Sequence, residues 1–340
     1  MFTILLLFLL ILLFVFIFGT VIGSFLNVVI LRAFSGESIV LPPSKCPKCG
    51  NKLKWWHNIP IISYMILKGK CYFCHEKISI QYPIVEFITG CLFLAVFFKY
   101  GITPHTLFAF IVVSILLVLT ITDIKKHVVF DSHTYFLISA GLIYNLLLTG
   151  FDIYDKFNSI TGFHPTAEWA FFTPITGSLL GLILGAVIME IAARIGYLIA
   201  GSRAFGEGDT YIAAGLGAVF GWQNIMLIIV AAIILQIVFT LPIYIKKQFE
   251  IRNWQAPISL FVFFLYAAIF FIIQHKTLLF SKSVYLIGGL IPLLAIGATT
   301  CFYILKGIKE ETNRTYLPFG PALAVSGIML LLANNLTFTF

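Results

Sequence analysis

Charged side chains are scarce in this sequence, and their scarcity excludes an ordinary water-soluble domain. Only 11% of the 340 residues are Asp, Glu, Lys or Arg, whereas 60% are hydrophobic. Soluble domains carry about 25% charged and about 45–50% apolar residues. The mean hydropathy is +1.02. The composition therefore predicts an integral membrane protein, an all-α bundle of spanning helices.

Several common hydrolase patterns are also missing. The sequence has no glycine-flanked serine of the G-x-S-x-G kind and no Walker-type phosphate loop. His75-Glu76 lacks the second histidine of the zinc-protease pattern H-E-x-x-H. The net charge of +8 would suit nucleic acid, but the basic residues fall in short loops between apolar runs, where they set membrane topology. We therefore expect a lipid bilayer and no nucleic acid as partners.

About 20 apolar residues are needed to cross a bilayer. Ten runs are candidates: 4–31, 82–98, 105–122, 129–149, 172–200, 211–222, 224–245, 257–275, 284–305 and 317–337. The first has no basic n-region and no cleavage site, so we interpret it as a retained span rather than a signal peptide. The run 211–222 is short and rich in glycine, and it is the weakest candidate for a full crossing.

Lys and Arg are distributed unequally between the two sides that ten spans would define. If the 32–81 loop is cytoplasmic, all but four of the 22 basic residues lie inside, the exceptions being Lys99, Lys156, Lys276 and Lys282. Omitting the run 211–222 would destroy this asymmetry in the later loops. The positive-inside rule then predicts ten spans with both termini outside.

Four of the six cysteines form two close pairs, Cys46-x-x-Cys49 and Cys71-x-x-Cys74. Two such turns can close a four-sulfur shell around one tetrahedral ion, so we expect a structural zinc site without an open position for water. A redox pair and a loop without an ion are the alternatives. Cys91 and Cys301 stand alone in apolar runs, where we expect them to act as small buried hydrophobes.

Two acids lie at the inner ends of their predicted spans, Asp123 and Asp209. Neighbouring carboxyls that share one proton supply both the base and the acid for peptide hydrolysis. Gly206 and Gly208 are expected to permit unusual backbone conformations and close approach of an extended peptide. The alternatives are that Asp209 caps a helix, that Asp123 pairs with Lys125 or Lys126, and that Asp131 is the second acid.

Several motifs occur together and in one order along nearly the whole chain: Gly23-Ser24-Phe25-Leu26-Asn27, Cys46-x-x-Cys49, Asn58-Ile59-Pro60, Gly69-Lys70-Cys71-x-x-Cys74, Tyr82-Pro83-Ile84-Val85-Glu86, Asp123-Ile124-Lys125, Gly206-Glu207-Gly208-Asp209 and Leu317-Pro318-Phe319-Gly320-Pro321. In this set the chain resembles the type IV prepilin peptidases, membrane aspartic proteases of the G-x-G-D type. The resemblance implies catalysis by Asp123 and Asp209, with Lys125 and Tyr211 shaping the substrate site beside them.

The resemblance further implies cleavage of leader peptides from prepilins and pseudopilins of type IV pilus and type II secretion systems. This would occur at the cytoplasmic face of the bacterial inner membrane. The family typically also N-methylates the new amino terminus with S-adenosylmethionine. The chain departs from the family at Tyr211, where a lysine is usual, and at Phe130, where a proline is usual. The runs 257–275 and 284–305 are also extra.

We thus expect a first span at 1–31, a cytoplasmic zinc-binding domain at 32–81 and a transmembrane peptidase domain at 82–340. Two other classes of function compete with this interpretation. One is a proton-coupled transporter, in which intramembrane carboxylates carry protons. The other is a membrane scaffold of a secretion machine without chemistry of its own. The sequence leaves the oligomeric state open.

Overall fold

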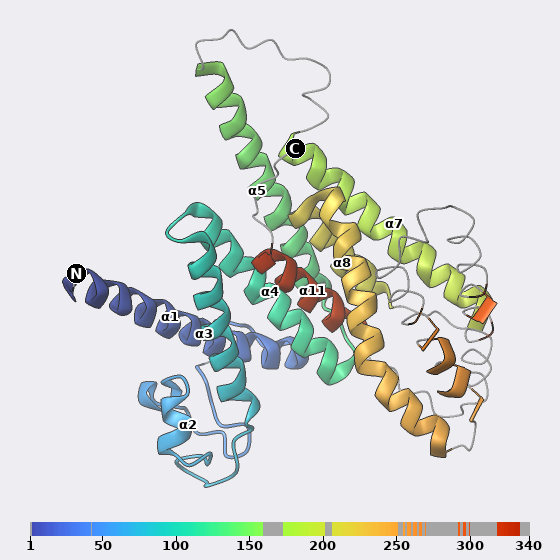
Figure 1. The fold of residues 1–340 in the computed structure, drawn as a ribbon. Helices are drawn as coiled ribbons and strands as arrows, with labels where there is room; N and C mark the ends of the chain where they lie inside the picture. The colour runs from blue at the N-terminus through green and yellow to red at the C-terminus, as the bar shows by residue number, and fades with distance from the viewer. Residues whose placement is uncertain are drawn as a thin grey trace. The chain divides into compact units, whose positions relative to one another are not determined.

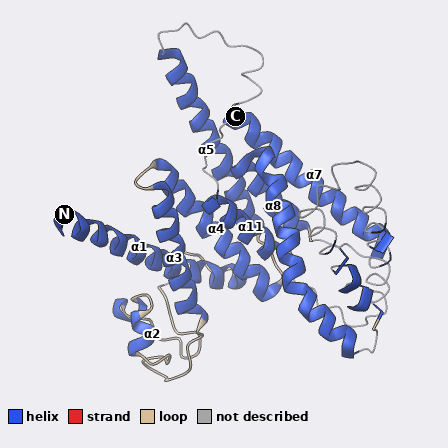
Figure 2. Cartoon of the chain, in the orientation of Figure 1, coloured by secondary structure: helices blue, strands red, loops and turns tan. Residues whose placement is uncertain are grey.

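The computed structural model describes residues 2–41, 43–158, 173–200, 206–250 and 318–333, together with isolated residues between 254 and 299. Every element in these residues is helical, and two isolated β-bridges are the only strand-like pairings among them (Figures 1 and 2). The predicted all-α class is confirmed. In chain order the elements are α1 Phe2–Ser35, η1 Trp55–Asn58, α2 Ile62–Ile66, α3 Gln81–Tyr100, α4 Pro104–Lys126, α5 Asp131–Asn158, α7 Pro174–Ala200, α8 Glu207–Glu250 and α11 Gly320–Ala333.

The chain divides into two compact units. The first contains Met1–Ala193, Phe205–Ile233 and Pro318–Phe340, and the second contains Arg194–Ala204 and Ile234–Leu317. All the candidate site residues belong to the first unit. The extra runs 257–275 and 284–305 belong to the second unit, and most of their residues lie outside the described part of the chain.

Six helices of the described chain are long and apolar enough to cross a membrane: α1, α3, α4, α5, α7 and α8. The first five predicted runs correspond one to one to α1, α3, α4, α5 and α7. The runs 211–222 and 224–245 both lie within α8, and the last run is described as α11. The multi-pass architecture is therefore confirmed, whereas the count of ten spans remains a prediction.

A break inside α8 explains why its sequence reads as two apolar runs. Gly221 has φ 77° and ψ 173°, which no helical residue adopts, so two helical arms meet there. A break in an apolar environment frees backbone carbonyls that need new donors. Asn145 of α5 donates to the Ala218 carbonyl at 3.0 Å, and Ser178 of α7 donates to the same oxygen at 2.5 Å. Two neighbouring helices thus supply hydrogen-bond donors to a carbonyl group that the break leaves without its helical partner.

Glycines let the helices of the first unit approach closely. A Cβ added to Gly217 of α8 would overlap the backbone of Gly181 in α7. A Cβ added to Gly23 of α1 would lie 2.7 Å from the Cα of Glu86 in α3. Small residues at such crossings are typical of helices that associate in lipid.

The helix α11 is held at its carboxyl end by the last turn of α3. The Lys99 ammonium donates to the Leu332 carbonyl at 2.8 Å, and the Tyr100 hydroxyl donates to the Leu331 carbonyl at 2.6 Å. These donors satisfy carbonyls that a helix end leaves unpaired. The α11 helix also packs along α4 (Figure 1). Its amino end, Gly320, is therefore fixed beside the last turns of α4.

Candidate aspartyl site and metal centre

Asp123 lies in the last turn of α4 and is 4% exposed. The helix ends at His127, whose left-handed backbone (φ 54°) lets its N–H donate to the Asp123 carbonyl at 2.8 Å. Lys125 and Lys126 follow in the same turn and are exposed. The carboxyl group therefore faces the protein interior at the very end of a spanning helix, while the neighbouring lysines face outward.

Asp209 lies in the first turn of α8 and is also buried. Its Oδ2 accepts a hydrogen bond from the Gly206 N–H at 3.0 Å, so the side chain reaches back to the residue that precedes the helix. This bond satisfies one of the amide groups that a helix start leaves free. Asp209 is therefore the third residue of α8 and not its N-cap, as the sequence alternative had it, and its carboxyl group instead caps the N–H of the residue before the helix.

Gly208 brings the start of α8 against the segment that follows α4. A Cβ at this position would lie 2.5 Å from the Cβ of Val129. Gly208 itself is helical, so its lack of a side chain matters through space and not through an unusual backbone angle. Gly206 also has no positive φ, contrary to the expectation for it, and open space surrounds its Cα, with Asp209 Oδ2 the nearest atom at 3.7 Å from an added Cβ.

The two carboxyl groups come together under the amino end of α11. They are close enough to interact electrostatically, and the backbone amide of Gly320 faces both of them. A Cβ added to Gly320 would overlap Asp123 Oδ2 and lie 3.0 Å from Ile212 Cδ1. That Asp123 oxygen is buried and has no hydrogen-bond partner among the described residues. Two buried acids, one unpartnered oxygen and one backbone amide thus lie close together at the amino end of α11.

The other acid considered from the sequence is placed differently. Asp131 is the first residue of α5, and its side chain is exposed. Tyr211, at the position where the resemblance implies a lysine, packs edge-to-face on Tyr135 of α5, with ring centroids 5.9 Å apart and a 68° angle between the planes. Both rings are partly exposed near the start of α8. An aromatic pair therefore stands where a cation was expected.

The four paired cysteines form a cluster in the loop between α1 and α3. Their sulfur atoms all lie within 4.8 Å of one another, and Cys46 Sγ is 3.9 Å from Cys74 Sγ. Zinc–sulfur bonds of about 2.3 Å place tetrahedral sulfurs about 3.8 Å apart, so the donor set and its spacing fit a tetrahedral zinc ion. The residues present therefore suit the predicted metal. Of the two single cysteines, Cys91 in α3 is exposed and not buried as expected, and Cys301 lies outside the described residues.

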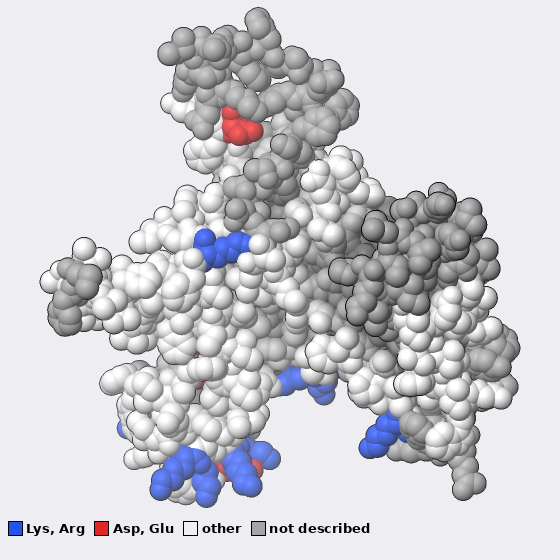
Figure 3. Space-filling model, in the orientation of Figure 1, with Lys and Arg blue, Asp and Glu red and all other residues white. Residues whose placement is uncertain are grey.

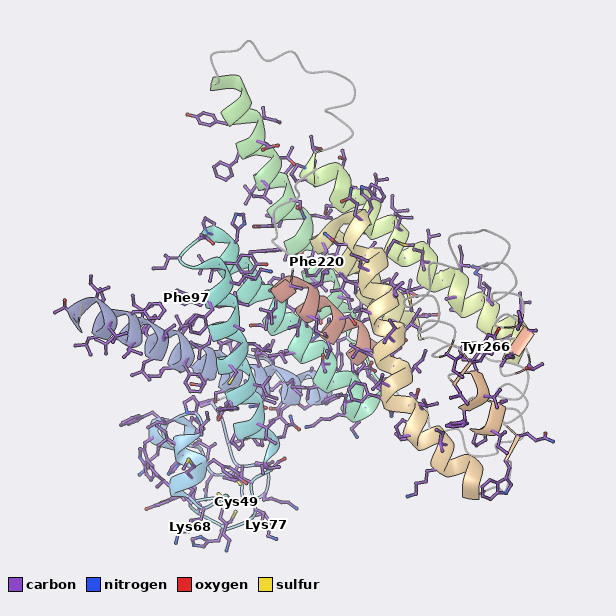
Figure 4. The ribbon with its side chains drawn as sticks, in the orientation of Figure 1. Cys49, Lys68, Lys77, Phe97, Phe220 and Tyr266 are labelled. Carbon is purple, nitrogen blue, oxygen red and sulfur yellow. The ribbon has the colours of Figure 1, made fainter. Side chains whose placement is uncertain are left out.

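Each cysteine pair is held by the same backbone arrangement. The Cys46 N–H donates to the Asn51 carbonyl and the Cys71 N–H to the Glu76 carbonyl, at 3.0 and 2.8 Å. Each turn closes on a residue with positive φ, Gly50 at 72° and His75 at 57°. Two equivalent turns therefore point their thiols at one centre. Figure 4 shows Cys49 at the lower edge of the loop.

The thiols of the cluster cannot all ionise without a cation. Backbone hydrogen bonds at Cys74 and Phe73 help to lower the pKa of the Cys71 thiol to about 7. A hydrogen bond at Glu76 lowers the pKa of Cys74, but burial and the neighbouring thiols outweigh it and raise that pKa to about 12. One thiolate thus forms readily at the expense of another, and a bound cation would remove this conflict.

Three features of the first unit were not predicted. Glu86 of α3 accepts a hydrogen bond from the Ile61 N–H at 2.7 Å, which joins the cysteine loop to a spanning helix. His57 is buried in that loop against Trp56 and Tyr72, and burial lowers its pKa. The Gly320 contact with Asp123 is the third. In the sequence, Glu86 and Gly320 stood out only as members of the motifs shared with the family, and His57 belonged to no motif.

Comparisons with known proteins agree on one family. The family model described as Bacterial Peptidase A24 N-terminal domain matches residues 17–100, and the model described as Type IV leader peptidase family matches residues 110–241. Among solved structures, none matches the chain.

Three curated relatives carry the name prepilin leader peptidase/N-methyltransferase. The chain is 32% identical to the Neisseria gonorrhoeae protein over 68% of its own length and 82% of the relative. It is 30% identical to the Klebsiella pneumoniae protein over 61% of its length and 84% of the relative. It is 33% identical to the Myxococcus xanthus protein over 62% of its length, and this match spans only 56% of that relative.

Proposed function

The chain belongs to the type IV leader peptidase family, and we propose that it is an aspartic endopeptidase that removes leader peptides from type IV prepilins and pseudopilins. The single observation that carries this proposal is the meeting of Asp123 and Asp209 beneath the Gly320 amide. The two acids come from different helices, and an enclosed pair of carboxyls is the arrangement that water-mediated peptide hydrolysis requires.

In the proposed mechanism the two carboxyls share one proton. The Gly206 N–H stabilises negative charge on Asp209, which favours Asp209 as the base that removes a proton from the attacking water. Asp123 then holds the shared proton, because the Gly320 amide faces both carboxyls whereas the Gly206 N–H stabilises Asp209 alone. Water adds to the scissile carbonyl as Asp123 protonates the carbonyl oxygen. The proton on Asp209 then passes to the leaving amine as the C–N bond breaks, while one hydroxyl proton of the tetrahedral diol returns to Asp123, which restores the pair with its single shared proton.

We place this site at the cytoplasmic face of the bacterial inner membrane, with both termini outside. The helices α3 and α4 are joined by a short turn and pack together, so their far ends lie on one side. Those ends carry the cysteine loop and Asp123. Lys and Arg side chains gather on the same loop (Figure 3), as expected of a segment that stays inside.

Two cofactors follow from the family and the sulfur cluster. We assign zinc to Cys46, Cys49, Cys71 and Cys74, where it would hold the 32–81 domain together and take no part in hydrolysis. We assign S-adenosylmethionine to a second reaction, N-methylation of the new amino terminus, without attributing that step to particular residues. In this proposal residues 1–31 supply the first span and 82–340 the peptidase domain, and Lys125 and Tyr211 border the substrate.

The transporter alternative is not favoured. Proton-carrying acids of transporters lie near the middle of the membrane, whereas Asp123 and Asp209 lie in the last and first turns of their helices.

The experiment that tests the function uses the purified chain in lipid vesicles with a full-length prepilin. Mass spectrometry of the products should find one cut, at the end of the basic leader, and no cut in a prepilin whose residue before the cleavage site is enlarged. The addition of S-adenosylmethionine should add one methyl group to the mature amino terminus. A prepilin that stays intact over many hours with folded, zinc-loaded protein would contradict the proposal.

A further inference from the structure

The short helix α2 carries an apolar face that no other described residue covers. Ile62, Met65 and Ile66 are spaced three and four residues apart, so they share one face of the helix. They are 53%, 70% and 71% exposed, and Trp55 of the adjoining η1 is 80% exposed. We call these four residues the α2 patch. The opposite side of α2 is satisfied internally, since the buried Ser63 hydroxyl donates to the Trp56 carbonyl at 2.6 Å.

The α2 patch is fixed at the level where α3 enters the membrane. Ile61, the residue just before α2, donates its N–H to Glu86 at 2.7 Å. Glu86 is the sixth residue of α3, so this bond lies about 8 Å along the helix from its start at a rise of about 1.5 Å per residue. Ile84 and Phe87 flank Glu86 and are exposed, so the exposed apolar surface of this candidate membrane span begins at the same height.

The hydrogen bond between Ile61 and Glu86 keeps a strained backbone conformation in place. Ile61 has φ 61°, a left-handed value that is unfavourable for a β-branched residue. Such conformations persist only where the surroundings hold them in place. The buried Glu86 carboxylate supplies that constraint through the Ile61 amide. The orientation of α2 relative to α3 is thus specified by the fold, and the outward direction of the patch with it.

We propose that the α2 patch docks into the interfacial layer of the bilayer, so that the zinc-binding loop rests on the membrane beside α3. The patch joins a lipid-facing surface at its own level, and tryptophan with large aliphatic side chains is the composition that membrane interfaces favour. Lys54 directly precedes Trp55 of the patch, a position from which its ammonium group can reach lipid phosphates. Four side chains are far fewer than the about 20–30 residues per side of a stable protein interface, which argues against a second copy as the occupant.

Docking would give the zinc-binding loop a second attachment to the membrane domain. The Glu86 bond holds one point of the loop, and lipid contact at the patch would restrain rotation about that point. Cys49, Lys68 and Lys77 lie together at the lower edge of the loop in Figure 4, below the position of α2 in Figure 1. The metal centre and its lysines would then face water while α2 faces lipid.

Depth-dependent fluorescence quenching tests this inference on the full-length protein. Met65→Trp places a tryptophan in the patch, and Lys77→Trp places a control beside the second cysteine turn. Each variant is reconstituted in phosphatidylcholine vesicles with bromine at the 6,7 or the 11,12 carbons of one acyl chain. The signal of the parent chain, which has five tryptophans, is subtracted. Zinc content and unfolding temperature verify that both variants fold, and Ile66→Trp on the same face replaces Met65→Trp if that variant does not.

Docking predicts that the added tryptophan at 65 or 66 loses at least twice as much fluorescence to brominated lipid as the one at 77. The shallow 6,7 label should quench more strongly than the deep one, and the emission should be blue-shifted. Equal quenching of the patch and control tryptophans would overturn the inference. An unquenched patch tryptophan whose emission shifts only when prepilin is added would also overturn it and would assign the patch to substrate. Peptidase activity is not read out, so failure here leaves the proposed function untouched.

Discussion

Replacement of Gly320 by alanine tests whether the amino end of α11 completes the aspartyl site. The added Cβ would overlap Asp123 Oδ2 and stand 3.0 Å from Ile212 Cδ1, and Ile212 is itself fully buried. The helix cannot simply withdraw, because Lys99 and Tyr100 hold its other end. The carboxyl group of Asp123 must therefore move away from the position it shares with Asp209.

The size of the effect follows from the displacement. Relief of the overlap requires a movement of the order of 1 Å, and such a misplacement of a catalytic group costs about 100-fold in rate. That loss corresponds to about 2.7 kcal/mol of transition-state stabilisation. Overpacking should also lower the free energy of unfolding by about 1–3 kcal/mol. We expect kcat to fall much more than substrate affinity, since the leader-binding surface is unchanged.

Gly327→Ala provides the matched control on the same helix. Its added Cβ would meet Leu216 Cδ2 at 2.7 Å, the flexible end of a side chain that is remote from the acids along α8. We expect a comparable loss of stability but cleavage within about threefold of the parent rate. The assay is the initial rate of prepilin cleavage in nanodiscs, with thermal unfolding measured in parallel. A folded Gly320→Ala variant that cleaves as fast as Gly327→Ala would refute the placement of Gly320 against the catalytic oxygen.

Three further outcomes follow from the same structure. The parent should bind about one zinc ion per chain by elemental analysis, and Cys49→Ser should lose it while Cys91→Ser, outside the cluster, retains it; retained metal in Cys49→Ser would contradict the assignment. Asn145→Leu should lower the free energy of unfolding by about 1 kcal/mol, because it removes a donor from the break in α8, and Ser139→Ala on the exposed side of α5 should not. Glu86→Leu should leave the Ile61 N–H unpaired and should therefore speed limited proteolysis of the cysteine loop. Glu86→Gln keeps an acceptor for that N–H, so its loop should be cut as slowly as that of the parent. Equal proteolysis rates for the two variants would show that this hydrogen bond does not hold the loop.

The sequence was sufficient for the class of the fold and for the convergence of the four paired cysteines. Long apolar runs mark spanning helices because each must satisfy its backbone internally, and five of the ten predicted runs correspond directly to described helices. The doubled C-x-x-C spacing predicts a tetrahedral sulfur set because each turn fixes two thiols locally. The four thiols do converge. Local spacing is enough in both cases.

Contacts between distant segments could not be obtained in this way. Gly208 was expected to adopt an unusual backbone conformation, but its backbone is helical. A glycine is needed there because Val129 lies where a Cβ would be. The position of Gly320 over Asp123 depends on how α11 packs along α4, which no periodicity reports. The break at Gly221 is likewise invisible to hydropathy, since both arms of α8 are apolar.

The central claim is that Asp123 and Asp209 act together as one hydrolytic pair. It is tested most directly by the initial rates of prepilin cleavage by Asp123→Asn, Asp209→Asn and Asp131→Asn in the same vesicles. Each variant changes one carboxyl oxygen and preserves volume. The account predicts at least a 1,000-fold loss, about 4 kcal/mol, for each of the first two and near-parent activity for Asp131→Asn, whose side chain is exposed. Cleavage at the parent rate by either of the first two variants would contradict it.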